Sequence, residues 1–114
     1  MAFENGLFNV MLDAAGGDVV EASLHTADPG GTGASEVAGG SYTRQAVTWE
    51  PASGASVAAA APIVFDVPAS TTVSHLGLWA AGGVWRGSIE FASPESFSGA
   101  GQLTVSPTTI SLTN

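Results

Sequence analysis

Apolar residues near the start of the chain recur with the period of an α-helix. One face of a helix is formed by the spacing i, i+3, i+4, i+7, which is occupied by Leu7, Val10, Met11 and Ala14. The pair Gly16–Gly17 predicts the end of this helix, because glycine readily adopts the positive φ found at helix C-termini. We therefore expect a short N-terminal helical segment within residues 1–17.

Beyond residue 17, apolar and polar residues alternate in short runs, which indicates β-strands. The pattern predicts strands over 20–25, 42–49, 57–67, 73–79, 84–91, 102–105 and 108–112. In the first, Val20, Ala22 and Leu24 would face a core, while Ser23 and His25 lie on the opposite, polar side. Turn residues such as Asp28–Gly30 separate the runs, and a loop is predicted over 93–99.

This succession of elements predicts a mainly β fold. Six to eight short strands with turns between them are typical of an antiparallel β-sandwich, of jelly-roll or immunoglobulin-like type. With 114 residues, the chain is long enough for one domain and too short for two. We expect a single domain over 1–114, with the helical segment over 1–17 and the sandwich over 18–114.

The charge balance excludes several classes of partner. Arg44 and Arg86 are the two cationic side chains, against ten carboxylates, so the formal net charge is −8. A chain this poor in cations is unsuited to nucleic acid or to anionic lipid, so we expect neither partner. The N-terminus has no basic region followed by an apolar stretch, which predicts synthesis in the cytoplasm without a signal peptide or membrane span.

Residues with catalytic or metal-binding chemistry are present without a supporting pattern. With no cysteine, thiolate chemistry is absent, and His25 and His75 have no nearby ligands at metal-site spacing. Ser23, His25 and Asp28 contain the residue types of a hydrolytic triad, but no G-x-S-x-G motif accompanies them. We expect no catalytic residue, no bound metal and no cofactor.

The loop after the first predicted strand is rich in glycine. Residues 30–33 lack the G-K-[ST] ending of a phosphate-binding loop, so the run is interpreted as a connection between strands. Asp28, Ser35 and Glu36 leave calcium binding open as an alternative, although their spacing matches no defined calcium motif.

The arginines and tryptophans are the remaining candidates for contacts. We expect Arg44 and Arg86 each to meet a carboxylate, either as a structural ion pair or at a contact between subunits. Trp79 and Trp85 are candidates for a stacking platform, as in carbohydrate-binding proteins, or for a place in the core.

Several segments together resemble a family of small virion proteins of tailed phages, labelled tail fibre or minor tail protein. The central block reads LHTADPG, then EV, GGSY and RQAV, over residues 24–47, with MLDA before it and a V.H.GLW strand after it at 73–79. The resemblance implies a non-enzymatic structural protein on the particle surface or tail apparatus. It implies as partners copies of the chain and other virion proteins, of the tail or the major capsid protein.

Two alternative functions stay open. A capsid decoration protein, which stabilises the head, belongs to the same class of virion structural protein. A carbohydrate-binding module for glycans of the host surface would use Trp79 or Trp85.

The N-terminal segment carries more apolar residues than one helix face can bury. We therefore expect Phe3, Leu7, Phe8 and Met11 to contribute to an assembly interface with a neighbouring subunit or the particle. The alternative is that the helix closes the open end of its own sandwich.

Overall fold

The computed structural model describes residues 4–105 and 109–111, which contain one helix and eight strands. Their bounds are α1 (Asn5–Asp18), β1 (Val19–His25), β2 (Gln45–Ala46), β3 (Ser56–Ala58), β4 (Ile63–Val67), β5 (Thr71–Ala80), β6 (Val84–Phe97), β7 (Gly101–Val105) and β8 (Thr109–Ser111). Every strand pair is antiparallel. The predicted fold class, mainly β with one short N-terminal helix, is confirmed.

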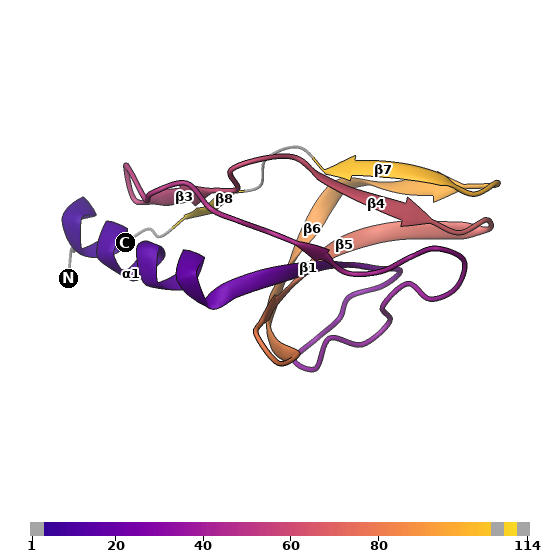
Figure 1. Ribbon diagram of the computed structural model, residues 1–114, viewed down its shortest axis with the longest axis horizontal. Helices are drawn as coiled ribbons and strands as arrows, with labels where there is room; N and C mark the ends of the chain where they lie inside the picture. The colour runs from indigo at the N-terminus through magenta and orange to yellow at the C-terminus, as the bar shows by residue number, and fades with distance from the viewer. Residues whose placement is uncertain (1–3, 106–108, 112–114) are drawn as a thin grey trace.

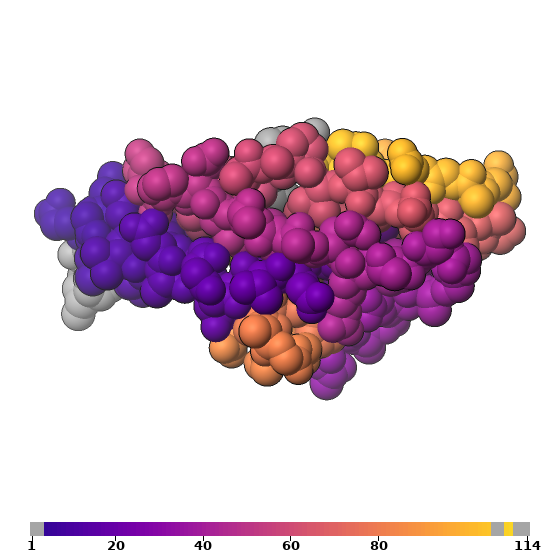
Figure 2. Space-filling model, in the orientation of Figure 1, coloured from indigo at the N-terminus to yellow at the C-terminus, as the bar shows by residue number. Residues whose placement is uncertain are grey.

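The strands form one sheet and two ribbons (Figure 1). The sheet has the order β2-β1-β5-β6, and the ribbons are β4-β7 and β3-β8. The β4-β7 ribbon covers the sheet on one side, while β3-β8 lies beside α1 at the other end of the molecule. The whole measures 47 × 28 × 25 Å, and Figure 2 shows the helix at one end of this elongated body.

The hydrophobic core lies between the four-stranded sheet and the β4-β7 ribbon. In β4, residues Ile63, Phe65 and Val67 are buried while the residues between them are exposed, as the alternation in the sequence predicts. They pack against the sheet through side chains such as Leu24 and Leu76, both fully buried.

The helix differs from its prediction at the C-terminal end. It runs through Gly16 and Gly17 to Asp18 and leads directly into β1, and neither glycine has positive φ. Gly16 serves a packing role instead, because a Cβ atom there would lie 3.2 Å from Cβ of Trp49. The predicted mechanism of termination by a glycine with positive φ was therefore wrong, although the helix ends only one residue later: Gly16 allows a close approach of Trp49.

Two strand predictions and one loop prediction also change. The predicted strand over 42–49 is reduced to β2, and the one over 57–67 is divided into β3 and β4. The predicted loop over 93–99 is wrong, because β6 continues to Phe97 and pairs with the start of β5. Pro94 is tolerated because residues 91–94 bulge out opposite the single residue Ser74.

Candidate functional site

The side of the sheet facing away from the core is covered by the segment of residues 26–44. Beneath this covering segment, Ser23 and His25 of β1 are both 0% exposed. The alternation along β1 predicted a polar side open to solvent, and this expectation was wrong. The segment returns over the strand, with Thr26 N–H donating to Ser35 O and Val37 N–H donating to Leu24 O.

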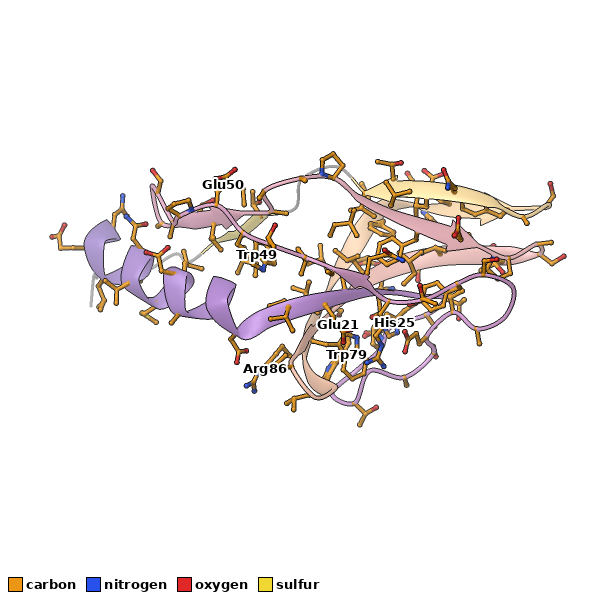
Figure 3. All side chains as sticks on the ribbon, in the orientation of Figure 1. Glu21, His25, Trp49, Glu50, Trp79 and Arg86 are labelled. Carbon is orange, nitrogen blue, oxygen red and sulfur yellow. The ribbon has the colours of Figure 1, made fainter. Side chains whose placement is uncertain are left out.

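A series of hydrogen bonds joins the sheet to the covering segment. Two of the residues that form it, His25 and Trp79, lie close together in Figure 3. Nε1–H of Trp79 donates to Oγ of Ser23 at 2.8 Å, Oγ of Ser23 lies 2.7 Å from Nε2 of His25, and Nδ1 of His25 lies 2.8 Å from the carbonyl oxygen of Ala34. A carbonyl oxygen can only accept, so Nδ1 of His25 carries the proton and Nε2 accepts from Ser23. Each polar group in this series of hydrogen bonds therefore has a partner.

A glycine makes room for this arrangement. Gly77 lies opposite Ser23 in the sheet. A Cβ atom at Gly77 would lie 2.5 Å from Nε2 of His25 and 2.8 Å from Cζ3 of Trp85, and it would collide with Oγ of Ser23. The hydrogen-bonded pair therefore occupies the space that a side chain at position 77 would take.

A second group of polar residues surrounds Arg44. Its guanidinium binds the carboxylate of Glu36 through Nη2 at 2.9 Å and through Nε at 3.0 Å. It also lies 3.7 Å from the centre of the Trp79 ring, a cation–π contact. The Tyr42 hydroxyl donates to Glu36 at 2.8 Å and accepts from the N–H of Leu24 at 3.0 Å. Arg44 thus holds the covering segment to the sheet.

Burial and hydrogen bonding shift the pKa values of this group. Burial by itself would raise the pKa of Glu36, but the hydrogen bonds from Arg44 and Tyr42 keep it below its ordinary value. Burial raises the pKa of Tyr42. Burial lowers the pKa of His25, and the hydrogen bond to the carbonyl oxygen of Ala34 offsets part of this decrease. At neutral pH the group therefore holds an ionised Glu36 and a neutral His25.

Arg86 has a different partner. Its guanidinium meets the carboxylate of Asp18 at 2.6 and 3.1 Å, linking β6 to the last residue of α1. The hydrogen bond from Arg86 lowers the pKa of Asp18. Both side chains are largely exposed, so the pair contributes little to stability. Within the chain, each arginine is thus paired with a carboxylate.

The tryptophans proposed for stacking lie together. Trp79 is only 7% exposed, and its ring meets that of Trp85 edge to face with 4.9 Å between centres. Trp85 is half-buried, and its Nε1–H donates to the carbonyl oxygen of Gly30 at 3.3 Å. With Arg44 over its ring, Trp79 offers little surface to a sugar.

The contact between Ser23 and His25 has the geometry of a nucleophile and its base, but a substrate could not reach it. Both side chains are 0% exposed beneath the covering segment.

Among the described residues, no group of three histidine, aspartate or glutamate side chains could hold a metal ion. Of the residues considered for calcium, Glu36 is engaged by Arg44 and Tyr42, and Asp28 accepts from the N–H of Gly30. These contacts hold the covering segment against the four-stranded sheet.

The helix presents an apolar face to solvent. Phe8 and Leu12 are buried against the body of the protein, Phe8 being 5% exposed. Leu7, Val10 and Met11 lie on the other side and are 46%, 67% and 49% exposed. We call these three residues the exposed helix face. Of the residues expected at an interface, Leu7 and Met11 lie on it, Phe8 lies inside, and Phe3 is outside the described residues.

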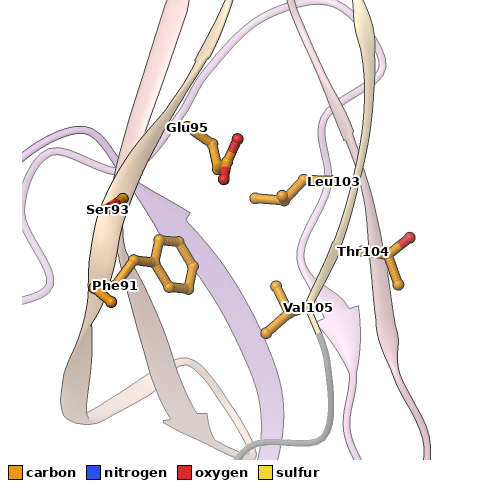
Figure 4. A pocket seen from close by; sticks show the side chains of 7 residues that line it. Phe91, Ser93, Glu95, Leu103, Thr104 and Val105 are labelled. Atoms are coloured by element: carbon orange, nitrogen blue, oxygen red, sulfur yellow. The ribbon is translucent and has the colours of Figure 1, made fainter.

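A groove opens between β6 and β7 (Figure 4). It has a volume of about 350 Å³ and is lined by the apolar side chains of Phe91, Leu103 and Val105, with Glu95 at its margin. Sequence reasoning missed this groove, because it results from the divergence of two strands that are adjacent in the chain yet belong to different sheets.

Comparison with known protein families gives a match over almost the whole chain. The family model described as Podophage GP4 fiber I protein gp80 matches residues 3–113. No curated protein and no solved structure matches the chain. No helix in the described part of the chain is long and apolar enough to cross a membrane.

Proposed function

Because the chain belongs to the family of podophage GP4 fiber I protein gp80, we propose that it is a structural subunit of the tail fibre and catalyses no reaction. The burial of the Ser23–His25 pair beneath the covering segment supports this proposal, since a substrate cannot reach that contact. Its partners would be further copies of the chain and other proteins of the tail.

The observation that carries an assembly role is the exposed helix face. Leu7, Val10 and Met11 provide three of the five large apolar side chains that are exposed in the described residues. An apolar surface of this kind marks a contact with another protein. Burying a fully exposed side chain of this kind contributes about 1.5–3 kcal/mol. These three are about half-exposed, so covering each contributes about half of that, which is enough together to affect association.

A double variant, Leu7→Asp with Met11→Asp, tests this role. Because both side chains point to solvent, the purified variant should keep the circular dichroism spectrum of the parent but fail to enter the virion. Val64→Asp with Val84→Asp is a matched control, since these side chains are 44% and 46% exposed and lie away from the helix. Unfolding of the helix variant, or its normal incorporation, would contradict an interface role.

The place of the protein in the particle is tested by labelling. An antibody against the chain should mark the tail of intact virions in electron micrographs, at a few copies per particle. Labelling of the head lattice at hundreds of copies would instead identify a capsid decoration protein. Binding to host glycans would require Trp85, so a tryptophan fluorescence response to host polysaccharide would favour the carbohydrate-binding alternative.

A further inference from the structure

The two layers of the sandwich differ in width. The four-stranded sheet ends in β6, whereas the facing ribbon contains only β4 and β7. Phe91 of β6 is half-buried, packs on the margin of the core and lines the groove between β6 and β7 (Figure 4). The outer edge of β7 therefore borders this groove.

The two strands that border the groove differ in how they could pair. The outer edge of β6 is interrupted where Arg86 bulges between the pairs Leu78–Gly87 and Trp79–Trp85, and again over residues 91–94, which include Pro94. Bulges, prolines and charges are features that protect an edge strand from pairing with another chain. The edge of β6 is therefore protected.

The edge of β7 has none of these protections. All five residues from Gly101 to Val105 pair with β4 in unbroken register, and none is proline or charged. In an antiparallel ribbon, alternate residues direct their N–H and C=O groups away from the partner strand. Among the described residues, no strand pairs with this side of β7.

We propose that β7 pairs with β7 of a second copy of this chain, antiparallel about a two-fold axis at Leu103. The two ribbons would then form one layer of four strands in the order β4-β7-β7-β4. Side chains alternate along a strand, so this register keeps Leu103 on the core side in both copies and places Gln102 opposite Thr104 on the outer side.

The groove offers a cationic partner little counter-charge. Each copy has a net charge of −8, so two copies repel each other least at surfaces with few carboxylates, and residues 101–105 are uncharged. Of the seven residues that line the groove, Glu95 alone is charged, which offers a basic strand a single counter-charge. An antiparallel edge is also complementary to itself about a two-fold axis.

Disulfide trapping tests the register, because the chain contains no cysteine. Gln102→Cys and Thr104→Cys each change an exposed side chain. In the proposed pairing these two positions face each other with Cβ atoms about 4.5–5.5 Å apart, close to the separation that a disulfide needs. Oxidising a mixture of the two variants should give a linked dimer containing one copy of each.

Three controls make the result specific. Each cysteine variant oxidised alone should remain mostly unlinked, because identical positions are out of register. A mixture of Thr104→Cys with Val84→Cys, an exposed residue of β6, should also remain unlinked. Adding Leu7→Asp and Met11→Asp to both cysteine variants should leave the linked dimer unchanged, since the proposed contact does not involve the helix.

Sedimentation of the parent protein completes the test. The proposal expects a monomer–dimer equilibrium that shifts toward dimer with rising concentration and with added salt, which screens the repulsion between acidic copies. A monomer at every concentration, equal linking in all mixtures, or loss of the dimer on changing the helix would overturn it. These measurements use the purified chain, so they are independent of where the protein lies in the virion.

Discussion

Replacing Gly77 with alanine is a direct probe of the buried hydrogen bonds beneath the covering segment. The new Cβ atom would lie 2.5 Å from Nε2 of His25 and 2.8 Å from Cζ3 of Trp85, inside van der Waals contact, and would collide with Oγ of Ser23. None of these atoms is at the end of a long flexible chain. Ser23 and His25 are also fixed by their hydrogen bonds to Trp79 and Ala34.

The cost follows from two separate effects. Overpacking a well-filled site costs about 1–3 kcal/mol. Moving Ser23 leaves the indole N–H of Trp79 or Nε2 of His25 without its partner, which costs about 1–3 kcal/mol more. Alanine recovers about 0.5–1 kcal/mol, because glycine is unfavourable within a strand, so the net loss should be about 1–5 kcal/mol.

Urea unfolding followed by circular dichroism measures this loss. Gly31→Ala is the matched control, since a Cβ atom at Gly31 meets no atom within 4 Å and the backbone there does not have positive φ. The control should unfold within about 0.5 kcal/mol of the parent. If Gly77→Ala were destabilised by less than about 1 kcal/mol, the site would be able to relax and the inferred rigidity of the Ser23–His25 contact would be wrong.

Two further predictions concern charge. The free energy of unfolding should decrease as the pH falls below about 6.5, because His25 with its lowered pKa stays neutral when folded while the unfolded chain takes up the proton. Denaturation across this pH range should show the slope in the parent and a reduced slope in His25→Gln, and equal slopes would contradict the assignment. Glu36→Gln should lower the free energy of unfolding by about 1–3 kcal/mol, because it weakens charged hydrogen bonds in a half-buried site. Asp18→Asn, at an exposed ion pair, should leave it unchanged within the error of the same urea titration, and similar losses in both variants would refute the distinction.

The local pattern of the sequence was sufficient for the β-rich class and for individual strands. The alternation Ile63, Phe65, Val67 places three side chains on one side of a strand wherever that strand packs. The turn at Asp28–Gly30 was also predictable, because Gly30 takes the positive φ that glycine tolerates. Both features depend only on neighbours within a few residues, so the sequence was sufficient to predict them.

Tertiary structure alone decided which polar residues became buried. Ser23 and His25 alternate with apolar residues, a pattern typical of the solvent-exposed face of a strand. They are buried because residues 26–44 return across that face. The same holds for Arg44, whose partner Glu36 is brought close by that return.

The helix illustrates the same division. Its spacing predicted one apolar face, yet the helix is apolar on two sides. One side carries Phe8 and Leu12, and the other carries Leu7, Val10 and Met11. Sequence alone determined that the segment is helical and too apolar to remain wholly in water. Which side packs on the chain's own strands depends on how α1 continues into β1, because that junction fixes the rotation of the helix about its axis.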